Sequence, residues 1–439
     1  MYMKIIDKLK NKNIAILGYG KEGKSTYKFL RKYIDTKITI IDRNENLYEQ
    51  NEELKKDTNI DIVVGENYLD NLDIYDIIIK SPGVKIPHDT NENIINKIYS
   101  QMELALEIYK ERVIGVTGTK GKSTTSSLLY KVLKDQDVDC YLLGNVGNPI
   151  FDYIEDISDE SLLIIEMSSY QLEMVNYSPH IGIILNLYEE HLNYHETKDD
   201  YFLSKLNMFK YQKESDYCLY TSDNKNVKTY LNDTYISNKL DIKKEFVING
   251  DEILFNDKVI YKKSNKRLLK GNHNLTNILF ILRIVLLLGY DIEKAVESIS
   301  TFKPLEHRME YVGVYNGITY YNDVIATIPE ATINCLNSLP GVDTLILGGL
   351  DRGINYELLI DYLKTSEVKN FICMPESGYK IADALVNKNT YKVETLEEAV
   401  KIAKEVTKNI CVLSPAASSY NQFKNFEEKG KLYKELIKE

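Results

Sequence analysis

The stretch Val113-Ile-Gly-Val-Thr-Gly-Thr-Lys-Gly-Lys-Ser-Thr-Thr125 decides the fold class of the chain. An apolar, β-branched run leads into a glycine-rich turn, and Gly121-Lys122-Ser123 then opens a helix with apolar positions up to Leu133. A strand, a glycine-rich loop and a helix in this order are typical of α/β proteins that bind phosphates, because backbone N–H groups and the helix N-terminus attract anions. The loop is one residue longer than a strict Walker A motif.

The same alternation of apolar runs and helical patterns continues on both sides of this loop. Continuous apolar runs of this length, with helices between them, favour parallel sheets buried on both faces, and therefore an α/β fold. One polar segment, residues 217–270, instead has the pattern of antiparallel hairpins. The predicted strands are Ile14–Leu17, Ile38–Ile41, Ile77–Ile79, Val113–Val116, Leu162–Ile165, Ile181–Leu187, Thr344–Leu347, Phe371–Met374 and Ile410–Leu413.

Two positions divide the chain into three predicted domains. The first lies near Ser100, before a helical stretch, and the second at Lys303-Pro304, after an apolar helix. A length of 439 residues agrees with about three domains. The predicted domains are residues 1–100, 101–303 and 304–439.

Composition and charge exclude several classes of protein. The net charge of −10 disfavours general nucleic-acid binding, which needs a cationic surface. The longest apolar run, Ile278 to Gly289, is interrupted by Arg283 and is too short to span a membrane, and residues 1–13 have no apolar core of a secretory signal. Five scattered cysteines without a CxxC pair predict buried free thiols. We expect a soluble, cytoplasmic protein without membrane or nucleic-acid partners.

A second glycine-rich turn near the N-terminus is typical of nucleotide binding. Gly18, Gly20 and Gly23 follow a predicted strand, and Asp42 ends the next strand, where a ribose-binding acid would lie. Nothing in this motif distinguishes a nicotinamide cofactor from another nucleotide. It is the only support for a rival prediction, a nicotinamide-dependent oxidoreductase.

Three residues in the middle segment are candidates for catalysis. Glu166 ends an apolar strand, where α/β sheets bind ligands, and its carboxylate suits Mg²⁺ beside a phosphate loop. His191 follows the run that ends at Leu187. Lys205 lies among apolar neighbours, which predicts a lowered pKa and a reactive neutral amine.

Taken together, four motifs resemble the Mur ligase family, the ATP-dependent enzymes that build the peptidoglycan stem peptide. The resemblance covers nearly the whole chain and implies an N-terminal Rossmann-like UDP-binding domain, a central P-loop-type ATPase domain and a C-terminal Rossmann-like domain. The last motif is similar to that of the members that add D-glutamate. The four motifs are Gly-Thr-Lys-Gly-Lys-Ser-Thr at 118–124, Glu-Met-Ser-Ser-Tyr-Gln-Leu-Glu at 166–173, His-Asn-Leu-Thr-Asn at 273–277, and Ser-Pro-Ala-Ala-Ser-Ser-Tyr-Asn-Gln-Phe-Lys-Asn-Phe at 414–426.

The resemblance implies a role for individual positions. The implied catalytic residues are Lys122, Glu166, His191 and Lys205, and the implied metal ligands are Ser123, Glu166, His191 and Lys205 as a carbamate. The implied ATP-binding residues are Gly118, Thr119, Lys120, Gly121, Lys122, Ser123, Thr124, Asn277, Arg308 and Asp323. The implied substrate-binding residues are Gly18, Lys21, Glu22, Asp42, Arg43, Ser81, Pro82, Gly83, Asn145, Ser168, Gln171, Thr327, Arg352, Ser419, Tyr420 and Phe426.

The resemblance also implies a reaction in peptidoglycan precursor synthesis. ATP activates the alanyl carboxylate of UDP-N-acetylmuramoyl-L-alanine as an acyl phosphate, and the amino group of D-glutamate then forms the amide. The expected cofactors are two Mg²⁺ ions and CO₂ as a lysine carbamate, and the expected state is a monomer. Two alternatives stay open: the same ligation with L-glutamate, and a non-catalytic switch that binds ATP.

Four positions depart from the pattern of the relatives. Lys120 stands where many have Asn, and Glu190 stands where Asp is usual. Arg352 and Ile325 stand where some relatives have lysine. Arg352 keeps the positive charge and can bind a carboxylate through two N–H groups.

Overall fold

The computed structural model describes residues 1–145, 148–190, 194–231, 234–269, 271–303 and 305–439. These residues form two compact units. One contains Met1–Lys262 with Leu279–Ser298, and the other contains Lys263–Ile278 with Ile299–Glu439. The two domain boundaries expected from the sequence, and the three domains they define, stay a prediction.

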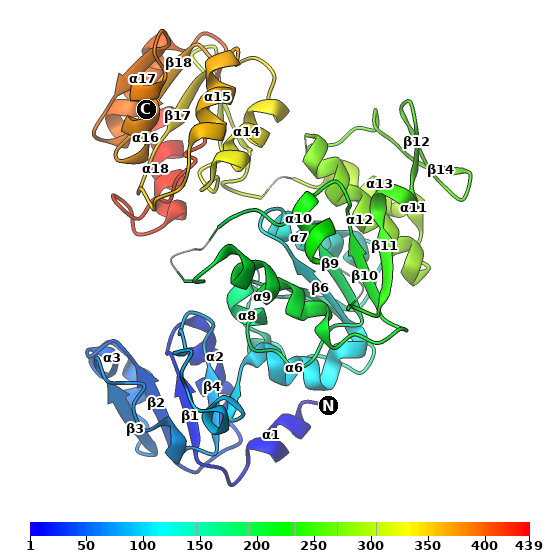
Figure 1. The fold of residues 1–439 in the computed structure, drawn as a ribbon, viewed down its shortest axis with the longest axis vertical. Helices are drawn as coiled ribbons and strands as arrows, with labels where there is room; N and C mark the ends of the chain where they lie inside the picture. Colours follow the sequence, from blue (N-terminus) through cyan, green and yellow to red (C-terminus); the bar gives the residue numbers. More distant parts are fainter. Residues whose placement is uncertain (146–147, 191–193, 232–233, 270, 304) are drawn as a thin grey trace. The chain divides into compact units, whose positions relative to one another are not determined.

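The first sheet is parallel and uses only strands from the first hundred residues (Figure 1). Its apolar runs are buried because helices cover the sheet, as expected for a parallel sheet. The strand order is β3-β2-β1-β4-β5. The strands are β1 Ile14–Leu17, β2 Ile38–Asp42, β3 Ile60–Val64, β4 Ile77–Lys80 and β5 Ile98–Tyr99, and the helices are α1 Met3–Leu9, α2 Lys21–Arg31, α3 Leu47–Gln50, α4 Glu52–Lys55, the short 3₁₀ helix Leu72–Ile74 and α5 Glu92–Ile95.

The second sheet carries the central phosphate loop. Its six parallel strands have the order β11-β10-β9-β6-β8-β7, so the carboxyl end of β6 lies between those of β8 and β9. Loops that follow these three strands therefore meet at one edge of the sheet. The strands are β6 Val113–Thr117, β7 Cys140–Gly144, β8 Leu162–Glu166, β9 Ile181–Ile184, β10 Tyr217–Tyr220 and β11 Asn238–Asp241. The helices around it are α6 Gln101–Tyr109, α7 Lys122–Lys134, α8 Ser169–Leu172, α9 Lys198–Lys210, α10 Lys225–Tyr230 and α11 Ile242–Glu245, with 3₁₀ turns at Lys110–Arg112 and Ile150–Asp152.

The antiparallel interpretation of residues 217–270 is correct for only part of that segment. Strands β12 Val247–Asn249, β13 Glu252–Phe255 and β14 Lys258–Lys262 form a small antiparallel sheet. Strands β10 and β11, however, pair in parallel and extend the main sheet. Helix α10 connects β10 to β11, and a parallel pair requires such a crossover. After β14, helices α12 Asn272–Leu288 and α13 Ile292–Thr301 follow.

The third large sheet is built after residue 305 and is covered by helices on both faces (Figure 1). Apolar residues of β17 face both layers of helices in turn. Leu345 and Leu347 pack with residues of α14, α15 and α16, whereas Ile346 packs with residues of α17 and α18. The order is β15-β16-β20-β17-β18-β19, and only β15 with β16 is antiparallel. The elements are β15 Glu310–Tyr315, β16 Ile318–Asn322, α14 Pro329–Ser338, β17 Val342–Leu347, α15 Glu357–Thr365, β18 Asn370–Cys373, α16 Ser377–Ala384, β19 Asn389–Lys392, α17 Leu396–Val406, β20 Ile410–Leu413 and α18 Phe426–Lys438.

Two further expectations from the sequence can be compared with the fold. The five cysteines are free and buried, as predicted. Among the residues described, every helix is too short or too polar to cross a lipid bilayer. The predicted α/β class with buried parallel sheets is confirmed.

A buried lysine in α18 makes the stability of the C-terminal unit depend on pH. The Lys429 amine donates to the carbonyl oxygen of Gly348 at 3.0 Å, and burial lowers the pKa of Lys429 to about 7. Below pH 7 the folded protein must bury the charged amine. Between about pH 7 and the ordinary lysine pKa of 10.5, the unfolded chain binds the proton that the folded chain lacks, so stability rises with pH.

Lys429→Met is therefore expected to unfold at a higher temperature than the parent protein at pH 7. Its advantage should shrink as the pH rises toward 10, because the parent then no longer buries a charge. Melting curves of both proteins between pH 6.5 and 10 measure this difference. A difference that stays constant over this range would contradict the assigned pKa.

Candidate active site

The central phosphate loop joins β6 to α7 through two glycines in left-handed conformations. Gly118 has φ +145° and Gly121, at the N-cap of α7, has φ +89°. The backbone conformation requires glycine here, and a Cβ on Gly118 would also lie only 3.0 Å from the Cβ of Leu185. The first N–H groups of a helix have no acceptor within it, which makes the start of α7 suited to phosphate oxygens.

Asn186 supports this loop and was not found by the sequence analysis. Its side-chain oxygen accepts from the backbone N–H of Lys120 at 2.8 Å, and its amide donates to the carbonyl oxygen of Lys120 at 2.9 Å. The N–H of Thr119 donates to the backbone oxygen of Asn186 at 2.9 Å. The sequence analysis placed Asn186 inside a predicted strand, Ile181–Leu187, but β9 ends at Ile184 and Asn186 belongs to the loop that follows it.

The lysine of the phosphate loop lies over the loop itself. Lys122 Nζ donates to the carbonyl oxygens of Gly118 and Thr119 at 2.9 and 3.0 Å. Ser123 and Thr124 are the next residues of α7, and Ser123 is half-buried. The loop therefore presents one amine and one hydroxyl group at the start of the helix.

Glu166 is a buried carboxylate with one oxygen atom left over. It ends β8 beside the phosphate loop and is 1% exposed. Its Oε1 accepts from the side-chain amide of Asn145 at 2.8 Å, whereas its Oε2 is buried and has no hydrogen-bond partner. A buried carboxylate oxygen without a donor is costly unless a cation binds to it. These donor atoms therefore fit a Mg²⁺ ion, which prefers oxygen ligands.

Lys205 is a buried amine close to the same group of charges. It lies in α9, is 1% exposed, and its Nζ is 4.7 Å from the centre of the Tyr201 ring. Burial first, and then the charge of Lys122, hold the pKa of Lys205 well below its usual value, although Glu190 and Glu166 act in the opposite direction. A neutral amine is the form that reacts with CO₂, so this position fits a lysine carbamate.

The two departures in this part of the chain, Lys120 and Glu190, form an ion pair. Their side chains approach to 2.9 Å, and Glu190 is buried. Lys120 therefore brings its positive charge to the phosphate loop together with a carboxylate. The adjacent candidate, His191, lies outside the described residues.

A second group of predicted residues joins the first sheet to the middle one. Glu22, in α2, accepts from the side-chain amide of Gln171 at 2.6 Å. Gln171 and Ser168 form a capping box at the start of α8. Burial raises the pKa of Glu22, although the bond from Gln171 and the charge of Lys80 lower it. Three predicted substrate residues thus come together beside the strand that ends in Glu166.

The N-terminal glycine turn uses Asp42 as an internal support. The two carboxylate oxygens of Asp42 accept from the backbone N–H groups of Tyr19 at 2.7 Å and Asn44 at 2.8 Å. The Ser81 hydroxyl donates to the carbonyl oxygen of Gly18 at 2.7 Å. The remaining predicted residues here are half-buried or exposed: Pro82 is half-buried, and Lys21, Arg43 and Gly83 are exposed.

Predicted nucleotide residues also occur in the other unit. Asp323 follows β16; burial raises its pKa to about 6, although the 2.8 Å bond from the Ser414 hydroxyl opposes this shift. Arg308 precedes β15 and its Nε is buried. Asn277 lies in α12, where its amide donates to the side chain of Asn274 at 3.2 Å.

The predicted substrate-binding residues of the last part of the chain follow strands of the third sheet at their carboxyl ends or begin α18. Arg352 Nη2 donates to the backbone oxygen of Thr327 at 3.4 Å, while its Nε is buried without a partner. The hydroxyl of Ser419 is also buried without a partner. Tyr420 is 68% exposed, and Phe426 begins α18. Free buried donors of this kind suit a carboxylate ligand.

Within the described part of the chain, one other group has donor atoms that could hold a metal. Glu111, His180 and Asp216 place ligand atoms within 4.8 Å of one another. They lie just before β6, β9 and β10, so they are at the edge of the sheet opposite to the phosphate loop. His180 Nδ1 is 2.7 Å from Asp216 Oδ1. The side chains of His180 and Asp216 already form a hydrogen bond with each other.

Comparison with known proteins now identifies the family. The profile described as Mur ligase MurD-like, N-terminal domain, matches residues 12–100, that of the Mur ligase middle domain matches 116–285, and that of the Mur ligase glutamate ligase domain matches 307–417. A protein of Clostridium kluyveri is 33% identical over 98% of this chain and 97% of its own length. The chain belongs to the Mur ligase family.

The relatives and the solved structures of the family agree with this result. The Clostridium kluyveri protein and one of Clostridioides difficile, 33% identical over 98% of this chain and 99% of its own length, are both named UDP-N-acetylmuramoylalanine–D-glutamate ligase. MurF ligase from Thermotoga maritima, solved in complex with ADP, has a TM-score of 0.63 at 16% identity over 98% of this chain and 96% of its own. UDP-N-acetylmuramate-alanine ligase MurC from Thermotoga maritima has a TM-score of 0.60 at 19% identity over 97% and 99%. These two structures share the fold of this Mur ligase.

Proposed function

We propose that this Mur ligase joins D-glutamate to the alanyl carboxylate of UDP-N-acetylmuramoyl-L-alanine with hydrolysis of ATP to ADP and phosphate. The observation that carries the proposal is the group of charges at one edge of the second sheet. There the phosphate loop lies beside Glu166, a buried carboxylate with a free oxygen, and the charges of Lys122 and Glu166 both act on Lys205, a buried amine of lowered pKa. The names of the full-length relatives supply the two substrates.

The reaction requires activation of a carboxylate, which is a poor acyl donor. An oxygen of the alanyl carboxylate attacks the γ-phosphorus of ATP, and the bond from that phosphorus to the bridging oxygen breaks to release ADP. The glutamate amine then attacks the acyl carbon and loses a proton, and phosphate leaves with the electrons of the acyl–oxygen bond. In this proposal Lys122 and the N–H groups of the loop hold the phosphates.

The metal-binding residues would be Ser123, Glu166 and the carbamate of Lys205, with His191 outside the described residues. Mg²⁺ bound there would neutralise charge on the phosphates and on the alanyl carboxylate. Lys205 would acquire its carbamate when its neutral amine adds to CO₂ and releases a proton. Two Mg²⁺ ions are part of the proposal.

The substrates divide among the three predicted domains. Residues 1–100 would bind the UDP group through the glycine turn and Ser81, and residues 304–439 would bind glutamate through Arg352 and Ser419. The buried unpartnered donors of Arg352 and Ser419 support the glutamate site. We propose a monomer that acts in the cytoplasm, since ATP and UDP-linked sugars are cytoplasmic metabolites.

Phosphate release from ATP and Mg²⁺ tests this function. Purified protein receives UDP-N-acetylmuramoyl-L-alanine with D-glutamate, with L-glutamate, or with neither amino acid. Release that needs both the UDP substrate and D-glutamate is the expected result, with the amide product detected by mass spectrometry. Preference for L-glutamate would change the substrate, and bound ATP without release in any mixture would favour a non-catalytic switch.

Asn186→Ala is expected to weaken ATP binding through the phosphate loop. The change removes two hydrogen bonds to the backbone of Lys120, each worth about 1 kcal/mol. KM for ATP should therefore rise roughly tenfold to thirtyfold, with little change in KM for glutamate. Steady-state kinetics with each substrate varied in turn measure both constants. An unchanged KM for ATP would show that the loop keeps its shape without Asn186.

A further inference from the structure

Arg308 is held in a turn whose backbone is unusual on both sides. His307 has φ +65° and Met309 has φ +47°, the left-handed region that residues with a side chain rarely occupy. The N–H of Arg308 donates to the carbonyl oxygen of Leu305 at 3.2 Å. Such a conformation persists only where surrounding contacts hold it.

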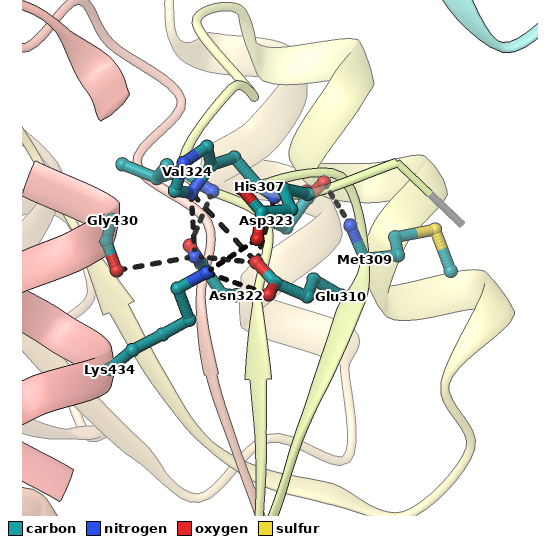
Figure 2. A network of polar contacts seen from close by, with 9 residues as sticks. His307, Met309, Glu310, Asn322, Asp323, Val324, Gly430 and Lys434 are labelled. Atoms are coloured by element: carbon teal, nitrogen blue, oxygen red, sulfur yellow. Dashed lines mark hydrogen bonds and ion pairs between the residues drawn. The ribbon is translucent and has the colours of Figure 1, made fainter. Parts of the chain in front are cut away.

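The carboxylates of Glu310 and Asp323 hold this turn, together with one backbone contact (Figure 2 shows the two carboxylates). The N–H of His307 donates to Glu310 Oε2 at 2.8 Å, and the N–H of Met309 donates to Asp323 Oδ1 at 3.0 Å. The carbonyl oxygen of His307 accepts from the N–H of Ile325 at 3.2 Å. Each residue that flanks Arg308 is therefore bonded to a group beyond the turn.

Asn322 lies at the centre of the network, at the end of β16. Its amide nitrogen is 2.9 Å from His307 Nδ1, 3.1 Å from Glu310 Oε2 and 3.4 Å from the carbonyl oxygen of Gly430 (Figure 2). Its oxygen accepts from the N–H of Val324 at 3.3 Å, which fixes the direction of the amide. Since the amide nitrogen can only donate, His307 Nδ1 must accept, and the ring is neutral with its proton on Nε2.

Helix α18 supplies the matching positive charge and packs against the histidine. Lys434 Nζ lies 2.8 Å from Glu310 Oε1 and 3.5 Å from Glu306 Oε1. A Cβ on Gly430 would lie 2.3 Å from His307 Nδ1, so only glycine allows this approach. The groups around His307 include Glu310 from β15, Asn322 from β16, and Gly430, Lys434 and the ring of Phe426 from α18, and the charges of Glu306 and Glu427 also act on it.

We propose that Asn322 is a positioning residue, which holds the turn between His307 and Glu310 so that the guanidinium of Arg308 is oriented for the nucleotide. The proposal rests on the proposed function, because that function assigns Arg308 to ATP. Asn322 itself is completely buried, so its action on a ligand passes through the turn. Lys434 strengthens the same arrangement by neutralising Glu310.

A double-mutant cycle of Asn322→Ala and Arg308→Ala tests this role in the full chain. We expect Asn322→Ala to raise KM for ATP about tenfold, with a much smaller change in kcat, since the turn keeps its chemistry but loses its orientation. In the Arg308→Ala background the same change should add nothing. The proposal would be overturned if the two substitutions together raised KM for ATP by the product of their separate effects, or if Asn322→Ala or Arg308→Ala alone left KM for ATP unchanged.

A second variant covers the case in which Asn322→Ala fails to fold. Lys434→Met changes only the outer end of the network and should raise KM for ATP in the same direction, again only when Arg308 is present. Lys431→Met, an exposed lysine on the same helix, serves as the matched control and should leave KM unchanged. A rise equal in both lysine variants would contradict the proposal.

The cycle is repeated as a binding experiment, with the dissociation constant of ATP measured by calorimetry without the other substrates. This readout separates the two proposals. If the parent protein binds ATP but forms no amide, the proposed function fails, and the cycle still tests whether Asn322 acts through Arg308.

Discussion

Lys205→Met is expected to lower kcat for amide formation by about 10²–10³-fold, the loss typical of removing one preorganised electrostatic group from an active site. The physical reason is that the buried amine, kept neutral by its surroundings, is needed as a carbamate to support the metal. The variant should still bind ATP, since the phosphate loop and Lys122 are intact. Phosphate release and ATP calorimetry measure these two properties.

The stability of this variant provides an independent check. Methionine has nearly the shape of lysine and removes a buried ionisable group, so the melting temperature should not fall. Lys210→Met, an exposed position on the same helix, is the matched control and should keep full activity. In buffer depleted of CO₂, the parent protein should lose activity and regain it with bicarbonate, whereas Lys205→Met should respond to neither. Parent activity that is independent of bicarbonate would contradict the carbamate.

Glu166→Gln is expected to raise the Mg²⁺ concentration needed for half-maximal activity about tenfold to a hundredfold. The buried Oε2 has no hydrogen-bond donor, and the neutral amide would place either an NH₂ group or a weaker oxygen ligand there. Asn145, which donates to the other oxygen, loses a charged acceptor in the same change. Activity at a series of Mg²⁺ concentrations measures the effect.

Glu160→Gln is the control for this prediction. Glu160 is exposed and lies just before β8, and its carboxylate contacts Arg112 at 3.4 Å, so its neutral variant should have the Mg²⁺ dependence of the parent. If Glu166→Gln gives the same titration curve as this control, Glu166 does not bind the metal.

The parts of the fold that could be predicted are those in which local sequence and packing agree. The apolar run before Gly118 forms β6 because both faces of the sheet are covered, and the two left-handed glycines follow from the loop motif itself. Lys205 was predicted to be buried with a lowered pKa, and its apolar neighbours in α9 do bury it. Such features depend on contacts close along the chain.

The parts that could not be predicted depend on which distant segments become neighbours. The segment that holds β10 and β11 is short in apolar runs and β11 is polar, which suggested hairpins, whereas the pairing of β10 with β9 and β11 makes these strands parallel. Asn186 supports the phosphate loop across a separation of 66 residues. Asp42 accepts hydrogen bonds from the backbone N–H groups of Tyr19 and Asn44, a supporting contact that the spacing of the motif does not reveal.

The network around Arg308 shows the same limit. The family resemblance implied Arg308 and Asp323 as separate ATP-binding residues and gave no role to His307 or Asn322. No pattern in the sequence connects them to Lys434, which lies 124 residues from Glu310 and reaches it from α18. Antiparallel pairing of β15 with β16 brings Glu310 opposite Asn322 and creates the network.

Transfer of ¹⁸O tests the central claim, that the alanyl carboxylate is activated as an acyl phosphate, most directly. UDP-N-acetylmuramoyl-L-alanine labelled with ¹⁸O in that carboxylate is incubated with ATP, Mg²⁺ and D-glutamate, and the released phosphate is analysed by mass spectrometry. The account predicts that each phosphate carries one oxygen from the labelled carboxylate. Phosphate free of ¹⁸O, released at the rate of ATP consumption, would contradict it.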